Sequence, residues 1–247
     1  MRLIDQTQFH SLKRPAHRKS LLFRRLHLFV VYVLGLLHAY PAYAEFDPLS
    51  AYGPEIRFDV MRNNRVIGEH VTRFERENDK LQVSSTMRLE IEVFFIPVYD
   101  FSYTAQESWG GGQLRALSVQ VEDGADAFAL NLEFNDGLIS PPPSSGYATE
   151  GAHVHYSTNH WHPNVVREKY ILNTLTGKIN QVSIKQGPRE QLSVLNGSVW
   201  ATRYDYFGDL TDTSAWYDDH DRWVKLRFKA RDGSMIEYFC RSCAVDE

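Results

Sequence analysis

Four of the ten histidines lie in residues 153–178, as two pairs whose members are separated by one residue. Residues two apart on a strand point to the same face, so each pair could offer two imidazoles to zinc, copper or nickel. A metal site needs further ligands, and exposed histidines or stacking beside Trp161 account for the same pattern. Metal binding is therefore the third hypothesis for function, with these candidate ligands: His153, His155, His160 and His162.

The chain contains two cysteines, Cys240 and Cys243, with two residues between them. In an oxidising compartment they are expected to pair, and because a disulfide cannot join residues three apart on an extended strand, the chain must turn after Cys240. Redox C-x-x-C motifs open a helix that lowers the pKa of one thiol, whereas this motif ends the sequence. A structural disulfide is the favoured interpretation, and free thiols or a redox role are the alternatives.

Glu107 lies among aromatic residues, a setting in which enzymes place catalytic acids. Solvent exposure or an arginine partner is the more ordinary expectation for such a carboxylate. The sequence contains no G-x-S-x-G, P-loop, H-E-x-x-H or Rossmann motif. We therefore assign no catalytic residues and no cofactor, and favour a protein that is not an enzyme.

Aromatic residues make up 13 % of the chain and are its best indication of function. A curved sheet with an aromatic concave face must cover that face with a helix or loop, or leave a groove for an apolar ligand. The leading hypothesis is binding of a hydrophobic or amphipathic small molecule or a lipid. The alternative is an interaction or structural module with a filled core. The residues expected to line or cover the ligand site are Phe101, Tyr103, Trp109, Trp161 and Trp216.

The strands that position these side chains are predicted by alternation of apolar and polar residues. Residues 81–95 place an apolar side chain at nearly every second position, and the pattern resumes at residues 99–109. Turn dipeptides such as Asp123-Gly124 and Asn196-Gly197 separate later strands. We predict a mainly β fold, a single curved antiparallel meander of roughly ten strands that resembles a half-barrel.

Residues 153–178, here called the hub segment, interrupt the strand pattern. Pro163 suits the first position of a helix, so a short helix over residues 163–172 is favoured, and a strand through residues 170–172 is the alternative. We expect this helix or loop to pack on the sheet.

Residues 1–44 differ from the rest of the chain. A basic lead, a short apolar run at residues 28–37 and the pattern Ala42-Tyr43-Ala44 predict a secretory signal peptide. The apolar run is shorter than the roughly 20 residues of a membrane-spanning helix, so we expect no stable span after cleavage. Residues 45–247 are then a single exported β-rich domain, periplasmic or extracellular.

Removal of residues 1–44 takes away seven Lys or Arg and one Asp, which changes the net charge from −4 to −10. Neutralising phosphate requires Lys and Arg, so an acidic exported domain is not expected to bind nucleic acid or anionic lipid head groups. Nothing in the sequence identifies a protein partner.

Five short motifs together resemble an exported bacterial family, domain of unknown function 6134. They are IGEH at residues 67–70, ESW at 107–109, HWHP at 160–163, LNTLTG at 172–177 and WY at 216–217. The resemblance covers about residues 55–239, and it implies an exported β domain without an activity to carry over. The predicted sheet also looks like the half-barrel of periplasmic lipoprotein carriers, which shelter acyl chains, although a fold alone does not decide function.

Overall fold

The computed structural model describes residues 46–93, 96–140 and 153–243. The predicted signal peptide lies outside these residues, as do residues 94 and 95 of the predicted strand 81–95. No helix within the three described ranges is long and apolar enough to cross a membrane.

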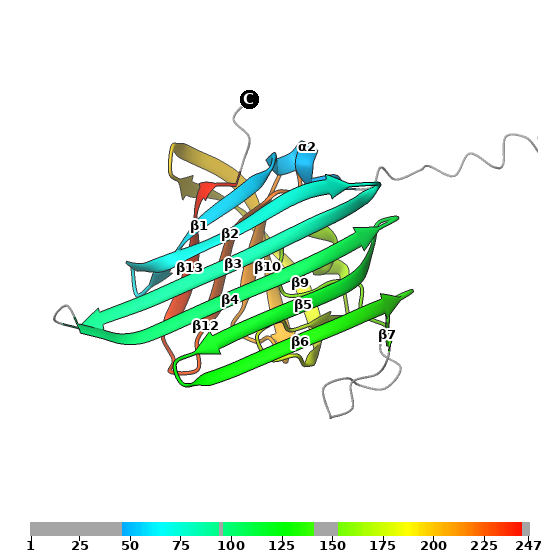
Figure 1. The fold of residues 1–247 in the computed structure, drawn as a ribbon. Coiled ribbons are helices and arrows are strands. Elements are labelled where there is room, and N and C mark those ends of the chain that lie inside the picture. The colour runs from blue at the N-terminus through cyan, green and yellow to red at the C-terminus, as the bar shows by residue number, and fades with distance from the viewer. Residues whose placement is uncertain (1–45, 94–95, 141–152, 244–247) are drawn as a thin grey trace, which may run out of the picture. The chain divides into compact units, whose positions relative to one another are not determined.

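Thirteen antiparallel strands form one sheet across the described residues (Figure 1). Its order is β7-β6-β5-β4-β3-β2-β1-β13-β12-β11-β10-β9-β8, so the sheet is open, with β7 and β8 at its edges. The strands are β1 (Glu55–Arg62), β2 (Arg65–Glu77), β3 (Lys80–Val93), β4 (Ile96–Gly110), β5 (Gln113–Asp123), β6 (Asp126–Asn135), β7 (Leu138–Ser140), β8 (Tyr170–Leu172), β9 (Ile179–Val194), β10 (Gly197–Gly208), β11 (Ser214–Asp218), β12 (Trp223–Lys229) and β13 (Met235–Ser242).

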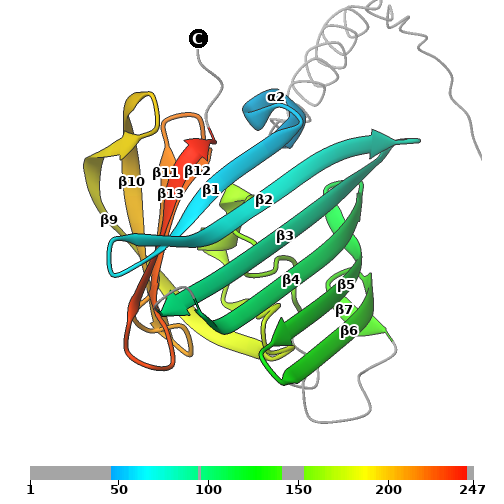
Figure 2. The same ribbon diagram turned by 60° about the vertical axis from the view of Figure 1, so that its left-hand side comes forward.

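The sheet curves so that β3–β6 and β10–β13 stand on opposite sides of the hub segment (Figure 2). This architecture confirms the predicted mainly β fold, although the sheet contains thirteen strands rather than about ten. The count differs because the short strands β7 and β8 are too brief to show alternation.

Alternating burial explains why the strands form where they do. On β3 the side chains of Leu81, Val83 and Met87 are buried, and on β4 their cross-strand partners Trp109, Glu107 and Tyr103 point to the same concave face. A period of two places every second side chain in the core, so the register of the two strands is held along their length.

The hub segment contains a shorter helix than the sequence predicts. A 3-10 helix, η1 (Pro163–Arg167), ends where Glu168 adopts an extended conformation, and β8 follows it. The predicted helix over residues 163–172 is therefore wrong beyond Arg167, and the alternative strand is correct. Pairing of β8 with β9 provides hydrogen-bond partners for the backbone groups of residues 170–172, and this outweighs the local preference for a helix. One further short helix, α2 (Pro48–Tyr52), precedes β1.

Gly68 on β2 marks a close approach between two strands. A Cβ atom built there would lie 1.9 Å from the carbonyl oxygen of Arg88 on β3. Any side chain would push the two strands apart, so only glycine fits this position.

We predict that Gly68→Ala lowers the free energy of unfolding by about 1–3 kcal/mol, because the added methyl group forces the backbone to shift. Chemical denaturation of the purified domain measures the change. Gly110→Ala is the matched control, since a Cβ there meets its nearest neighbour, Arg115, at 3.7 Å. Equal stability of the two variants would contradict the assigned close approach.

Candidate functional site

The carboxylate of Glu107 joins the sheet to the hub segment. Glu107 extends from β4 and is 1 % exposed. Its Oε1 accepts hydrogen bonds from Ser157 Oγ at 2.8 Å and Asn159 Nδ2 at 2.5 Å. Its Oε2 accepts from the indole nitrogens of Trp109 at 2.9 Å and Trp161 at 3.0 Å. These four neutral donors offset the cost of burying the carboxylate. The expectation that Glu107 faces solvent or pairs with an arginine is therefore wrong.

Three tyrosines from separate strands and α2 add hydrogen bonds to the same segment. Tyr52 donates to the carbonyl oxygen of Trp161 at 2.7 Å, and Tyr217 donates to that of His160 at 2.8 Å. Tyr103 lies 2.6 Å from the Asn159 side-chain oxygen. Burial raises the pKa of each phenol well above its ordinary value, so all three stay protonated and able to donate. The sheet thus binds both backbone and side chains of the hub segment.

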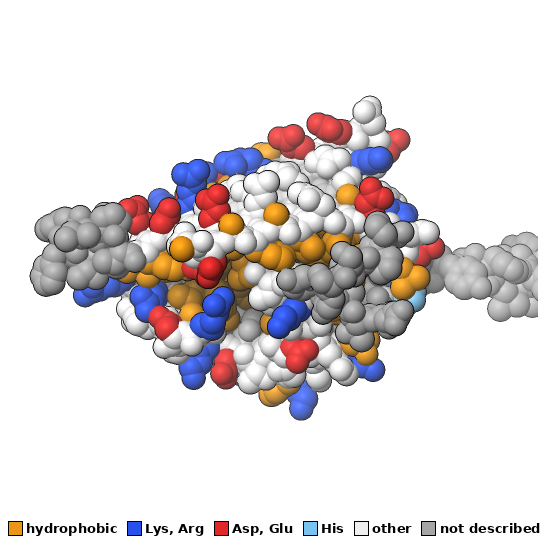
Figure 3. Space-filling view, turned by 60° about the horizontal axis from the view of Figure 1, so that its bottom comes forward, with side chains coloured by type: hydrophobic (Ala, Val, Ile, Leu, Met, Phe, Trp, Pro, Cys, Tyr) orange, Lys and Arg blue, Asp and Glu red, His pale blue; other side chains and the backbone are white. Residues whose placement is uncertain are grey.

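A cavity of about 120 Å³ lies between the hub segment and the sheet. Its sheet wall includes Met87, Trp223, Leu226 and Tyr238, and its hub wall includes Asn159. None of the described residues that line it is Asp, Glu, Lys or Arg. Viewed from the end where the β10–β11 and β12–β13 turns lie, hydrophobic side chains gather in a hollow between charged rims (Figure 3).

His70 on β2 faces this cavity. It is 3 % exposed, and its Nδ1 has no hydrogen-bond partner among the described residues. The ring lies against the aromatic rings of Phe58, Trp223 and Tyr238, with centroid distances of 6.3, 5.7 and 5.3 Å. Burial lowers the pKa of the imidazole to about 4, so it is neutral at pH 7.

His160, across the cavity, is neutral for the same reason. Burial lowers its pKa to about 3, and its Nδ1 lies 3.2 Å from the Tyr206 hydroxyl. Its backbone adopts a φ of 57°, a left-handed conformation that non-glycine residues seldom take. With His70 and His160 both uncharged, the walls of the cavity carry no ionised group at neutral pH.

Of the five aromatic residues predicted to bind a ligand, Tyr103 lines this cavity. Phe101, two positions earlier on β4, is buried in the core and does not line it. Trp109 and Trp161 are engaged by Glu107 and line a separate pocket of about 160 Å³.

Trp216 lies apart from the other four. It precedes Tyr217 on β11, and since neighbouring residues on a strand point to opposite faces, it projects away from the hub segment. Its indole nitrogen donates to Glu190 at 3.0 Å, and the cationic groups of Lys225 and Arg227 lie 5.2 and 5.4 Å from its ring. The structure therefore does not bring the five residues to one site.

The four histidines predicted as metal ligands point into different surroundings. The rings of His153 and His155 are 6.2 Å apart, whereas His160 contacts Tyr206 and His162 stacks on Trp109 at 5.7 Å. Among the described residues, no group of three or more His, Cys, Asp or Glu side chains could hold one metal ion. The four side chains are not placed to share an ion.

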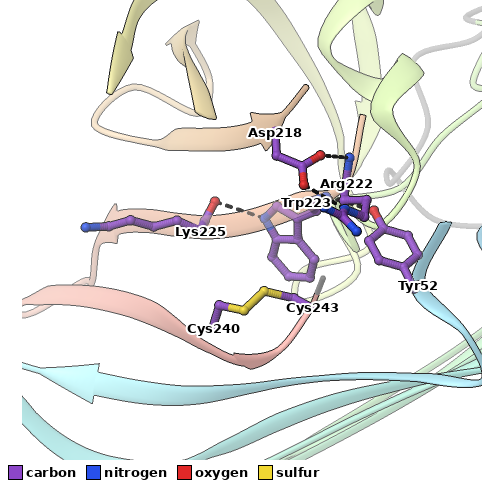
Figure 4. The surroundings of a disulfide bond; sticks show 7 residues. All are labelled: Tyr52, Asp218, Arg222, Trp223, Lys225, Cys240 and Cys243. Atoms are coloured by element: carbon purple, nitrogen blue, oxygen red, sulfur yellow. Dashed lines mark hydrogen bonds and ion pairs between the residues drawn. A yellow bond between two sulfur atoms is a disulfide. The ribbon is translucent and has the colours of Figure 1, made fainter. Parts of the chain in front are cut away.

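Cys240 and Cys243 form a disulfide with a Cα–Cα distance of 5.7 Å (Figure 4). Both cysteines are buried, and the bond lies beside Trp223. The backbone nitrogen of Trp223 donates to the Tyr52 hydroxyl at 2.8 Å, and the carbonyl oxygen of Cys240 accepts from Leu195 N at 3.1 Å. Buried sulfurs in a packed setting are typical of a structural disulfide.

Comparisons with known proteins agree with this fold. A family model described as a domain of unknown function, DUF6134, matches residues 58–241 and confirms the family resemblance of the five motifs. Among solved structures, the chain is similar to a beta-barrel-like protein of domain of unknown function DUF1849 from Brucella abortus. The TM-score is 0.51 at 9 % identity, over 78 % of this chain and 98 % of that chain, so the similarity concerns the fold alone. No curated protein matches this chain.

We predict that Glu107→Gln lowers the free energy of unfolding by about 3 kcal/mol, because the amide turns an NH₂ group toward donors and leaves them unpaired. Chemical denaturation followed by tryptophan fluorescence measures the loss. Glu133→Gln, an exposed change on β6, is the control and is expected to have little effect. Similar stabilities for both variants would refute the anchoring role.

We also predict that stability falls as the pH drops from 7.5 to 5.5. His70 has a folded pKa near 4, below the unfolded value near 6.5, so the unfolded chain takes up its proton first and stability is fully present only above pH 6.5. His70 then accounts for about 1 kcal/mol of the loss at pH 5.5. His70→Gln should shrink the pH dependence by this amount, and the exposed His153→Gln should not. Identical pH profiles for wild type and His70→Gln would contradict the prediction.

Proposed function

We propose that this chain binds a hydrophobic or amphipathic molecule between its sheet and its hub segment. The chain belongs to the family of the domain of unknown function DUF6134. The observation that carries the proposal is the partly open cavity beside His70, with apolar and aromatic side chains on its sheet wall. The family description assigns no activity, so the proposal stands on the site itself.

The size of the cavity indicates how much of a ligand it could enclose. An apolar protein cavity of roughly 150 Å³ binds benzene, so about 120 Å³ suits one ring or a short alkyl segment. Moving that portion out of water is favourable by about 25 cal/mol for each Å² of apolar surface buried. The remainder of a longer amphipathic molecule would extend through the opening.

We further propose that the protein works outside the cytoplasm, in the periplasm or cell envelope. The basic lead, apolar run and Ala42-Tyr43-Ala44 pattern support export. The Cys240–Cys243 disulfide also supports it, because disulfides persist in oxidising compartments.

Native mass spectrometry of protein purified from an exporting host tests the proposal. We expect an excess mass of a small organic molecule that disappears on denaturation. A metal-sized excess would instead favour the histidine hypothesis. A bare polypeptide mass that also acquires no adduct from added lipid would overturn ligand binding and favour a structural or interaction module.

We predict that Leu226→Trp abolishes the excess mass, because the larger side chain fills the cavity that Leu226 lines. Leu195→Trp is the matched control, since Leu195 is 51 % exposed and lies outside the cavity. Circular dichroism verifies that both variants fold. Retention of the adduct by a folded Leu226→Trp protein would place the ligand elsewhere.

A further inference from the structure

Three buried side-chain atoms lack a hydrogen-bond partner among the described residues: His70 Nδ1, Gln113 Oε1 and Asn180 Oδ1. Of these three residues, His70 lines the cavity. A buried polar group without a hydrogen-bond partner is costly, so an imidazole in this setting gains from a ligand group that pairs with its ring.

The imidazole of His70 is held in place by its surroundings. On the sheet it lies between Phe58 of β1 and Met87 of β3, its cross-strand partners. Trp223 and Tyr238 contact its ring from the other half of the sheet. A ring packed in this way cannot turn toward another partner without opening the core, so its position is set before any ligand arrives.

Polar groups on the hub wall of the cavity are already engaged with one another. The Tyr103 hydroxyl lies 2.6 Å from Asn159 Oδ1 and 3.0 Å from Thr174 Oγ1. Asn159 Nδ2 donates to Glu107, and Thr174 Oγ1 also lies 3.1 Å from Thr158 Oγ1. The His70 imidazole also lines the cavity, and its Nδ1 has no partner among the described residues.

The cavity wall contains no Asp, Glu, Lys or Arg among the described residues, and this limits which ligands can bind there. A carboxylate or ammonium group placed there would lose its hydration without meeting an opposite charge, which is costly. A hydroxyl group is uncharged and can both donate and accept, so it pairs with either tautomer of a neutral imidazole.

We infer that the ligand is an uncharged amphiphile whose hydroxyl group, attached to a ring or short alkyl segment, hydrogen-bonds to the imidazole of His70. This inference rests on the proposed function and specifies the chemical class of its ligand. His70 is the residue that selects hydroxyl-bearing molecules over hydrocarbons of the same shape.

Three small probes of similar shape test the inference with the purified domain: p-cresol, p-xylene and p-toluate. Trp223 lines the cavity, so tryptophan fluorescence titration reports occupancy. We predict that p-cresol binds at least tenfold more tightly than p-xylene, and that p-toluate binds more weakly than both. In His70→Phe, which keeps an aromatic ring but no nitrogen, the preference for p-cresol should fall to near one. The exposed His153→Phe should retain it.

A readout on the wild-type protein keeps the test independent of whether His70→Phe folds. On addition of p-cresol, the ¹⁵N resonances of the His70 imidazole are expected to shift, and p-xylene is expected to leave them nearly unchanged. Equal affinity for p-cresol and p-xylene, or a preference for p-toluate, would overturn the role of His70 but leave cavity binding intact. Failure of all three probes to bind would overturn this inference, and a bare mass in the native spectrum would separately overturn the proposed function.

Discussion

The structure depends on one buried carboxylate. Glu107 can be buried because Ser157, Asn159, Trp109 and Trp161 supply a neutral donor to each of its four hydrogen bonds. Loss of any one donor leaves part of the desolvation cost uncompensated, so the hub segment is constrained to the conformation that presents all of them. The left-handed backbone of His160, next to Trp161, is part of that conformation.

The same anchoring explains why a cavity exists beside His70. Short polar side chains of the hub segment meet each other and Tyr103, and so they do not fill the space in front of His70. Apolar residues such as Leu226 close the opposite wall. The outcome is a pocket with a polar network on one wall, aromatic and aliphatic side chains on the other, and no ionised group at neutral pH. Such a pocket suits a small uncharged molecule better than a charged one.

Much of the sheet was predictable because strand alternation is a local signal. The alternation at residues 81–93 and the turns at Asp123-Gly124 and Asn196-Gly197 correspond to observed strands and hairpins. The end of the helix at Arg167 was not predictable, because it depends on pairing with β9. The site was predicted in part: Tyr103 lines the cavity, whereas Trp109 and Trp161 bind Glu107 instead. His70 was missed as a site residue because one histidine on an alternating strand carries no signal of its own.

Residue order alone was sufficient for the β class, the positions of most turns and the expectation that Cys240 pairs with Cys243, since each follows from neighbours within a few residues. The remaining features were determined by contacts between residues that are far apart in the sequence. Glu107 and Trp161 are 54 residues apart, and the hydrogen bond from Trp223 to Tyr52 spans 171 residues. The way the sheet curves around the hub segment determines which aromatic side chains fill the core and which histidine faces a cavity. No local sequence pattern encodes how the sheet and the hub segment meet.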